Sequence, residues 1–313
     1  MADGTPIEWT DATWNPVTGC SVVSPGCSNC YAMRLAGSRL AAHPSRAGLT
    51  VPSRAGPVWT GQVRLNTQWL AEPLRWRRPR RIFVCAHGDL FHQAVPDGWI
   101  DQVFAAMALA PRHAFQLLTK RPERMRDYLA GLPDALGRLA VTLVPHPAFP
   151  DAPRPLSSLL DLSVFTRPLP NVWAGVSVET AGWAAERLPH LRDTPAALRW
   201  VSAEPLLGPV DLRPWLIGPG RLDWVVAGGE SGRGARPMHP DWVRALRDQC
   251  ADAGVPFLFK QWGAHAWAVA TEGDPATLAP SQVGKSVAGR TLDGVLHDAF
   301  PPHPAPRVLQ EAR

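Results

Sequence analysis

Short apolar runs alternate with helical segments along most of the chain. Each run is rich in Val, Ile, Leu, Phe or Trp, ends in polar or Gly residues, and precedes a segment with apolar residues at helical spacing. Seven such runs lie at 61–66, 81–89, 113–122, 171–179, 198–208, 222–232 and 255–263. The stretch 13–20, TWNPVTGC, is an additional predicted strand, followed by a predicted helix over 30–43. The pattern therefore predicts eight strand–helix units.

This alternation predicts an α/β fold with a parallel sheet, because near-continuous apolar strands are typical of sheets buried on both faces. Eight units are the number in a (β/α)8 TIM-like barrel, and we expect such a barrel, complete or partly open. A doubly wound open sheet is the structural alternative. The barrel domain is expected over 1–270 with a Pro-rich insertion at about 131–170, and an irregular C-terminal extension over 271–313.

Composition and charge narrow the classes of protein. The chain has 313 residues and 14 Trp, so it is expected to fold around a core rather than to be disordered. Its net charge of +5 permits a nucleic-acid or phosphate-bearing partner without requiring one. No stretch approaches the roughly 18 consecutive apolar residues of a membrane span, and the first residues lack the features of a secretory signal. We therefore expect a cytoplasmic protein with no membrane partner.

Three of the five cysteines lie in one early loop. Cys20, Cys27 and Cys30 have the spacing C-x6-C-x2-C, and in a reducing compartment such a group is more typical of a metal site than of disulfides. Three thiolates suit a [4Fe–4S] cluster, because they bind three irons and leave the fourth open. The alternative is a zinc site, which needs a fourth ligand; the candidates are Cys85, His87 and His92.

Charged or small polar residues follow nearly every predicted strand. In a barrel, residues at the carboxyl ends of the strands surround the active site, so we expect them to share one mouth with the cysteine loop. The candidates for cofactor contact are Asp89, Glu179, Gly228, Gly229 and Glu230, and those for catalysis are Lys120, Glu204 and Lys260. The alternative is that these are ordinary solvated loops. Glu204 is expected to point into the barrel and to need a partner there, which is either a cation, Lys260 or Lys120, or a ribose or amino group of a ligand.

Two further segments carry positive charge. The Gly-rich stretch 228–237 follows a predicted strand, and it would either cradle a phosphate with its backbone N–H groups or form a plain tight turn. The segment 74–81, LRWRRPRR, has five arginines around Trp76. It favours either contact with nucleic acid or a solvated helix end. If it lies on the rim opposite Cys30, it cannot position a substrate for a cluster.

Several motifs together resemble one family, the phage-associated proteins of unknown function that are labelled by bacteriophage gene-product numbers. These motifs span about 7–263 and read IEWTDATWNPVTGCSVVSPGCSNCYA, GDLFH, LLTKRPERM, GVSVE, WVSAEPLLG, VVAGGESG and FLFKQWG. The family looks like a distant branch of the radical S-adenosylmethionine (SAM) enzymes, which bind a [4Fe–4S] cluster through three cysteines after the first barrel strand. Here the first gap has six residues instead of three, and the Gly-Gly-Glu segment follows a late strand rather than the second.

The resemblance implies that Cys20, Cys27 and Cys30 hold a [4Fe–4S] cluster whose open iron binds SAM. An electron from a reductant would then cleave SAM to a 5′-deoxyadenosyl radical, which abstracts hydrogen from the substrate. Phage association and the Arg-rich segment point to a nucleotide or nucleic acid as substrate. The alternative function is a zinc-stabilised nucleic-acid-binding module without catalysis.

Overall fold

The computed structural model describes residues 4–132, 168–269 and 278–302. Its core is one seven-stranded parallel sheet, and the order of the strands in the sheet is their order along the chain. In order, the strands are β1 (Ala12–Trp14), β6 (Arg81–Val84), β7 (Ala114–Gln116), β8 (Val172–Ser177), β9 (Leu198–Ala203), β10 (Trp224–Gly228) and β11 (Phe257–Gln261).

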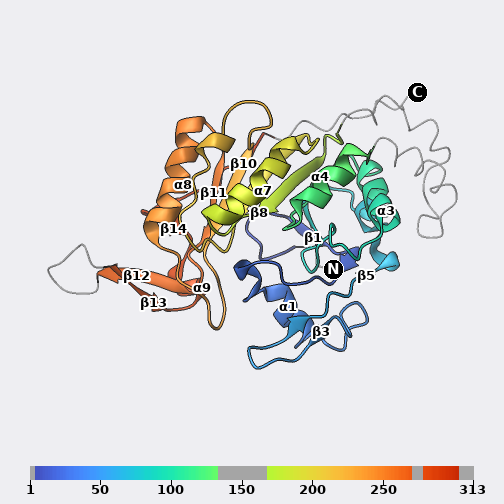
Figure 1. Ribbon diagram of the computed structural model, residues 1–313, viewed down its shortest axis with the longest axis horizontal. Coiled ribbons are helices and arrows are strands. Elements are labelled where there is room, and N and C mark those ends of the chain that lie inside the picture. The colour runs from blue at the N-terminus through green and yellow to red at the C-terminus, as the bar shows by residue number, and fades with distance from the viewer. Residues whose placement is uncertain (1–3, 133–167, 270–277, 303–313) are drawn as a thin grey trace.

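The order of the strands identifies the sheet as part of a barrel. It runs from β1 to β11 without a reversal, whereas a doubly wound sheet reverses its order at the ligand-binding crevice. The sheet curls, with helices on its outer side (Figure 1). Among the residues described, β1 and β11 do not pair with each other. The predicted TIM-like barrel is therefore confirmed in its partly open form.

Within the described residues, four helices cover the outer face of the sheet. Their apolar sides and the outward residues of the strands form the larger buried cluster, in which Phe104 and Leu188 from the helices join Ile82 and Val201 from the strands. Between β9 and β10 a single 3-10 turn replaces a helix. The four helices are α3 (Asp97–Ala108), α4 (Pro122–Ala130), α7 (Ala181–Asp193) and α8 (Pro240–Ala253), and the turn is Arg213–Trp215.

The predicted strand at 61–66 does not join the sheet, so the prediction of eight parallel strands is wrong by one. Only β5 (Arg64–Leu65) is extended there, and it pairs antiparallel with β2 (Val17–Thr18). Its apolar residues Val63 and Leu65 pack against the helix-side core from the edge. Between β1 and β6 the chain forms small elements instead: α1 (Tyr31–Ala36), β3 (Thr50–Val51), β4 (Val58–Trp59), the 3-10 turns Pro25–Cys27 and Thr67–Trp69, and α2 (Glu72–Arg75).

The inner face of the half-barrel changes character along the strands. Because successive strand residues point to opposite faces, every second residue points inward. Towards the amino ends these are large apolar side chains, and they form a second buried cluster with Trp9 that contains no residue of the four outer helices. Trp200 packs on Trp9 and Trp224, with ring centroids 5.1 and 5.2 Å apart. Towards the carboxyl ends the inward positions become small or polar: Ser177, Ser202, Glu204, Gly228 and Lys260.

A C-terminal segment lies along the free edge of the sheet. The backbone of 297–299 pairs with β11 in the antiparallel direction, with Phe259 N donating to His297 O at 2.9 Å. Phe300 then stacks on Trp224, with centroids 5.2 Å apart, and the guanidinium of Arg81 on β6 lies 3.9 Å from its ring. This segment partly covers the free edge at β11, which would be paired in a closed barrel.

Other segments complete the described chain. Two hairpins and a short helix follow β11: β12 (His265–Val269) with β13 (Leu278–Gln282), α9 (Lys285–Ala288), and β14 (Thr291–Leu292) with β15 (Val295–Leu296). They fall largely in the stretch expected to be an irregular extension. Most of the Pro-rich insertion expected at 131–170 lies outside the described residues. None of the described helices combines the length and apolar character needed to span a membrane.

Candidate functional site

The cysteine loop lies at the carboxyl end of the sheet, directly after β2. Gly19 bridges to Gly88 after β6, which fixes the start of the loop on the rim. The loop contains a 3-10 turn, Pro25–Cys27, and ends at Cys30, the N-cap residue of α1. All three thiols are free; Cys27 is buried, and Cys20 and Cys30 are half-buried.

Burial is the main influence on the pKa of two of these thiols, Cys20 and Cys30. Burial raises the pKa of the Cys20 thiol to about 12, against the opposing charge of Arg121. It also raises the pKa of Cys30, although the backbone N–H groups of Met33 and Ala32 favour the thiolate there. Without a metal these two thiols are therefore protonated at neutral pH, and a metal must displace their protons when it binds.

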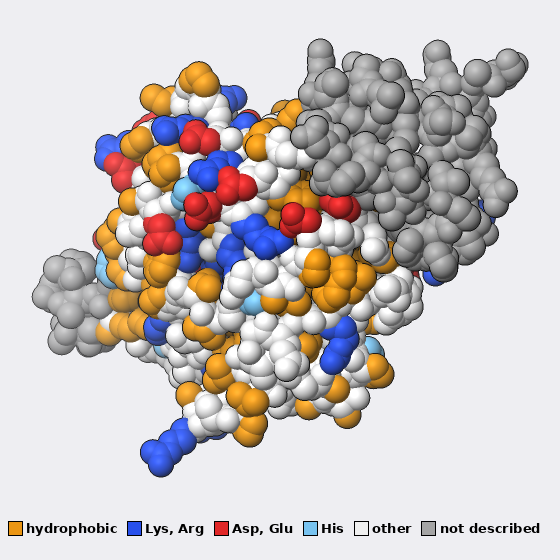
Figure 2. Space-filling view, turned by 45° about the vertical axis from the view of Figure 1, so that its right-hand side comes forward, with side chains coloured by type: hydrophobic (Ala, Val, Ile, Leu, Met, Phe, Trp, Pro, Cys, Tyr) orange, Lys and Arg blue, Asp and Glu red, His pale blue; other side chains and the backbone are white. Residues whose placement is uncertain are grey.

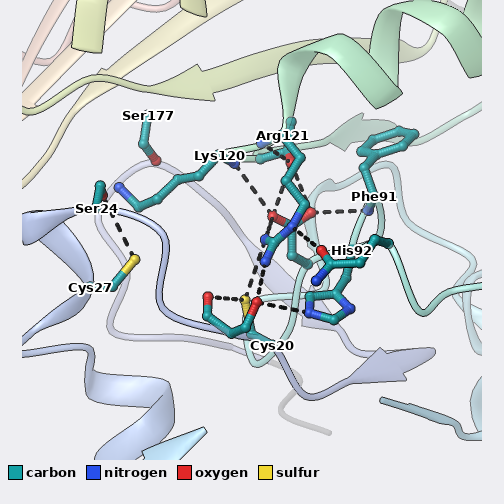
Figure 3. A network of polar contacts seen from close by, with 12 residues as sticks. Cys20, Ser24, Cys27, Phe91, His92, Lys120, Arg121 and Ser177 are labelled. Carbon is teal, nitrogen blue, oxygen red and sulfur yellow. Dashed lines mark hydrogen bonds and ion pairs between the residues drawn. The ribbon is translucent and has the colours of Figure 1, made fainter. Parts of the chain in front are cut away.

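A polar network around Arg121 holds the first cysteine (Figure 3). Arg121 Nη1 lies 3.7 Å from Cys20 Sγ and 2.8 Å from Asp89 Oδ2, and its Nη2 donates to Ser21 Oγ at 2.6 Å. Asp89 also accepts from Thr119 Oγ1 at 2.8 Å. The buried carboxylate of Asp89 is thus occupied by protein donors, and its direct role is to fix Arg121.

Glu179 supports the centre of the cysteine loop. It is fully buried, forms ion pairs with Lys120 and Arg187, and accepts from Ser24 Oγ at 2.7 Å. Gly26 packs directly on it, because a Cβ at this position would lie 2.3 Å from Glu179 Oε1. A buried carboxylate is stable only when its charge is compensated. Here that compensation joins β7, β8 and α7 to the loop.

Glu204 and Lys260 form a second charged pair on the rim. Lys260 Nζ lies 2.6 Å from Glu204 Oε1, which confirms the expected pairing, and the two side chains remain 15% and 20% exposed. Gly228 packs closely against this pair, since a Cβ there would lie 3.3 Å from the Cβ of Lys260 and 3.5 Å from Glu204 Oε1. The hydroxyl of Tyr31, which follows Cys30 in the chain, donates to Ala86 O at 2.6 Å.

Glu230 ties the loop after β10 to the cysteine loop. Its carboxylate accepts from Arg236 Nη2 at 2.6 Å and from Asn29 Nδ2 at 2.8 Å, and Arg236 also donates to Pro25 O at 2.9 Å. Gly229 permits the close approach of the Trp262 backbone, since a Cβ would lie 2.1 Å from its oxygen. We call these contacts of Asn29, Glu230 and Arg236 the clasp.

The predicted site residues therefore fall into three groups that all contact or adjoin the cysteine loop or the rim. Asp89, Lys120 and Glu179 lie under the loop, Glu230 belongs to the clasp with Gly229 beside it, and Gly228, Glu204 and Lys260 line the adjacent rim. The Arg-rich segment 74–81 is different. It leads into the amino end of β6, where Arg81 pairs with Asp11 at the start of β1. The segment therefore lies on the rim opposite Cys30, where it cannot position a substrate at the cysteines, and its contact with nucleic acid stays a prediction.

The sequence places Thr119 and Arg121 at the end of the predicted strand 113–122 but gives neither of them a role at the cysteines. It gave no signal that was used for three other residues of the site: Ser24, Asn29 and Arg187. Arg187 carried one usable signal. It occupies the apolar face of α7, between Ala184 and Leu191 at helical spacing, where a charge is unexpected unless it has a buried partner.

The donor set can be compared with the two candidate metal centres. No three Cys, His, Asp or Glu side chains in the described parts of the chain are already grouped around one point as ligands of a single ion. A cubane cluster binds each thiolate through a different iron, so its ligands need not converge on one point. The neighbouring cations suit the net negative charge that three thiolates give such a cluster. Two of the candidate fourth zinc ligands already have hydrogen-bond partners. His87 lies 2.9 Å from Arg46 Nη2, and His92 lies 3.0 Å from Ser21 Oγ.

These features define a partly open parallel α/β barrel with a three-cysteine loop at its mouth. The chain belongs to the family described as "Protein of unknown function (DUF5131)", whose model matches residues 4–301. The resemblance to a family of unknown function is thereby confirmed. Among curated proteins, no sequence matches this chain.

Two solved structures show a weak similarity. A cysteine-to-serine mutant of spore photoproduct lyase matches with a TM-score of 0.35 and 10% identity, over 87% of this chain and 68% of that chain. Spore photoproduct lyase complexed with dinucleoside spore photoproduct matches with a TM-score of 0.34 and 11% identity, over 87% and 67%. Similarity of this degree assigns no function to the chain.

Proposed function

We propose that this chain is an iron–sulfur protein that binds a [4Fe–4S] cluster through Cys20, Cys27 and Cys30 and acts as a radical-SAM-type enzyme. One observation carries the proposal. Three unpaired thiols from one short loop lie at the carboxyl end of the half-barrel, and charged side chains from the ends of β6, β7, β8 and β10 support that loop.

The electrostatics of the loop support an anionic cluster. Arg121 approaches Cys20, and the positive charge of Lys120 favours the thiolate form of Cys30. The N–H groups at the start of α1 act on Cys30 in the same direction. When bound, the cluster would supply an electron for the reductive cleavage of SAM at its open iron.

The chain's own residues have distinct roles in this proposal. The ion pairs of Asp89, Lys120 and Glu179 hold the cysteine loop in place. Lys260 and Glu204 keep exposed polar surface on the inward side of the strands, and they are the candidates to contact substrate or SAM. Gly228 and Gly229 let SAM or the neighbouring backbone approach closely. Water exclusion would rest on the apolar residues below them.

A nucleotide or nucleic acid remains the proposed substrate, supported by the basic net charge and by Lys120 and Lys260 on the rim. The alternative, a zinc-stabilised nucleic-acid-binding module, has less support. Proteins of that kind usually gather Lys and Arg on one face. On the face in Figure 2, Lys and Arg side chains lie beside Asp and Glu rather than forming an uninterrupted basic surface.

Anaerobic reconstitution with iron and sulfide tests the metal centre. We expect a brown protein with about four irons per chain, and we expect each of Cys20→Ala, Cys27→Ala and Cys30→Ala to lose the colour. Cys250→Ala is the matched control, because this thiol is fully buried on α8, away from the loop. A colourless wild type with one zinc would instead support the binding module.

A second measurement tests the activity. The reconstituted protein is incubated with SAM and dithionite, and 5′-deoxyadenosine is sought among the products. Its formation by the wild type but not by Cys27→Ala supports the radical-SAM assignment. A full cluster without SAM cleavage would remove that assignment and leave the cluster itself intact.

A further inference from the structure

Arg121 is placed to act on the cysteine loop through a sulfur atom. Its side chain is 11% exposed, and its guanidinium contacts four partners at the carboxyl end of the half-barrel: Cys20, Ser21, Asp89 and Gln93. Nη1 faces both Cys20 Sγ at 3.7 Å and Asp89 Oδ2 at 2.8 Å, and Nη2 donates to Ser21 Oγ at 2.6 Å. Lys120 immediately precedes Arg121 in the chain, but it pairs with Glu179, so the cation that contacts Cys20 is Arg121.

The orientation of Arg121 is fixed on every side. Asp89, which pairs with it, is itself held by Thr119 Oγ1 and by the N–H of Phe91 at 2.9 Å. Arg121 Nε donates to Gln93 Oε1 at 3.1 Å, and its backbone N donates to Thr119 Oγ1 at 2.9 Å. A guanidinium held this firmly keeps its donor on Cys20 without further loss of side-chain freedom.

The long gap between the first two cysteines takes part in this arrangement. Ser21 is the first residue of the gap, and its hydroxyl contacts both Arg121 Nη2 and His92 Nε2. The loop therefore offers Arg121 two neighbouring acceptors, the thiol of Cys20 and the hydroxyl of Ser21. Arg124, three residues further along α4, lacks this role: it donates to Val95 O and pairs with Asp97.

A hydrogen-bond donor to a cluster-ligating sulfur shifts the reduction potential of the cluster in one direction. Reduction adds one electron to the cluster, from the 2+ to the 1+ state of its [4Fe–4S] core, and no bond or proton needs to change. The added negative charge is stabilised by a nearby cation and by hydrogen bonds to the ligating sulfur, so both raise the reduction potential.

We propose that Arg121 is a positioning residue that raises the reduction potential of the cluster through its contact with the Cys20 sulfur. This inference rests on the proposed cluster. It makes the cluster reducible by a low-potential one-electron donor that would otherwise be too weak. The competing explanation is that Arg121 only neutralises Asp89 and stabilises the fold.

The test is a redox titration of reconstituted wild type and variants with dithionite, followed by the EPR signal of the reduced cluster. Arg121→Gln removes the charge and the donor fork, and we expect its midpoint potential to be more negative than that of wild type. Arg121→Lys keeps the charge but not the fork, and we expect an intermediate potential. Arg124→Gln removes an ion-paired arginine from the same helix, and we expect the wild-type potential.

The outcomes separate this inference from the proposal on which it rests. A wild type that forms no cluster defeats both. Full clusters with the same potential in all four proteins overturn only the role of Arg121. If the Arg121 variants lose iron while the metal-free protein keeps its wild-type melting temperature, the contact is needed to present Cys20, which supports positioning. Loss of iron with a lower melting temperature than that of Arg124→Gln shows a role in the fold and overturns the inference.

Discussion

At the scale of single residues, the site depends on buried charges that have complete partners. Glu179 is 0% exposed, and one carboxylate serves Lys120, Arg187 and Ser24 together. Removing one partner of a buried ion pair leaves the other charge uncompensated, which costs more than the pair contributes when intact. The position of the cysteine loop therefore depends on side chains that are not proposed to bind the metal.

We expect Arg187→Met to lower the free energy of unfolding by about 3 kcal/mol, because it leaves Glu179 with one cation in a buried site. Chemical denaturation of the metal-free protein measures this change. Arg192→Met is the control on the same helix, since Arg192 pairs with Asp193 at the surface. We expect a loss of about 1 kcal/mol or less there. Equal losses in the two variants would show that Glu179 does not depend on Arg187.

We expect Gly26→Ala to reduce the cluster content and to destabilise the protein by about 1–3 kcal/mol, since overpacking forces a rigid neighbour to move. The added Cβ would meet Glu179 Oε1 at 2.3 Å, and that carboxylate is held by three partners. Gly98→Ala on α3 is the control, because no atom lies within 4 Å of its added Cβ. We expect this control to be neutral or slightly stabilising. Iron content per chain and thermal melting give the result.

At the scale of elements, two loops far apart in sequence are joined by the clasp. Burial opposes ionisation of Glu230, but hydrogen bonds from Arg236 and Asn29 outweigh it and hold the pKa of this carboxyl below its ordinary value. A lowered pKa stabilises the folded state above the ordinary pKa of about 4.3. This contribution is lost as the pH falls through the lower folded-state value.

We therefore expect Glu230→Gln to destabilise the metal-free protein by about 1–2 kcal/mol at pH 7, where charge-assisted hydrogen bonds are lost. The difference from wild type should begin to narrow as the pH falls below about 4, and it should vanish below the lowered folded-state pKa, where Glu230 is protonated in the folded and the unfolded protein. Urea unfolding at several pH values measures it. Asp211→Asn is the control, since Asp211 pairs with Arg213 on the exposed surface, and it should change little. A difference that is constant with pH would contradict the ionic origin of the clasp.

The sequence predicts well those elements whose residues are all buried. The run 171–179 is buried at every position of β8, and its apolar composition alone indicates a central strand. The run 61–66 has only two apolar residues, Val63 and Leu65, so its composition is a weaker indication of a sheet strand; pairing is a tertiary property, and β2 pairs with only two of its residues. Roles such as that of Arg187 were not predicted, because its partner Glu179 lies eight positions away and faces it only after α7 packs on β8.

At the scale of the whole molecule, the main departure from expectation is how the barrel ends. The sequence predicts eight parallel strands, whereas the structure has seven and a C-terminal segment running along β11 in the opposite direction. Residues 297–300 are too few for hydrophobic periodicity to predict their contact with β11. The position of the segment follows instead from the aromatic interior, because Trp224 offers an apolar face that Phe300 covers.

Phe300 should therefore stabilise the entire half-barrel although it lies far along the chain from the site. Its ring stacks on Trp224 and lies under Arg81, so it links β10 to β6 across the barrel. We expect Phe300→Ala to lower the free energy of unfolding by about 2 kcal/mol, less than for a fully buried Phe because this ring is half-buried. Tryptophan emission should shift to longer wavelength in the native protein as Trp224 becomes hydrated.

Val287→Ala provides the comparison within the same C-terminal region. Val287 is 71% exposed on α9, so its truncation should change stability by roughly 0.5 kcal/mol or less and leave the emission unchanged. Equal effects of the two substitutions on stability, or wild-type emission in Phe300→Ala, would show that Phe300 does not stabilise the half-barrel. If the expected difference is found, the aromatic interior needs this segment as its cover, and the end of the chain contributes to the scaffold that holds the cysteine loop.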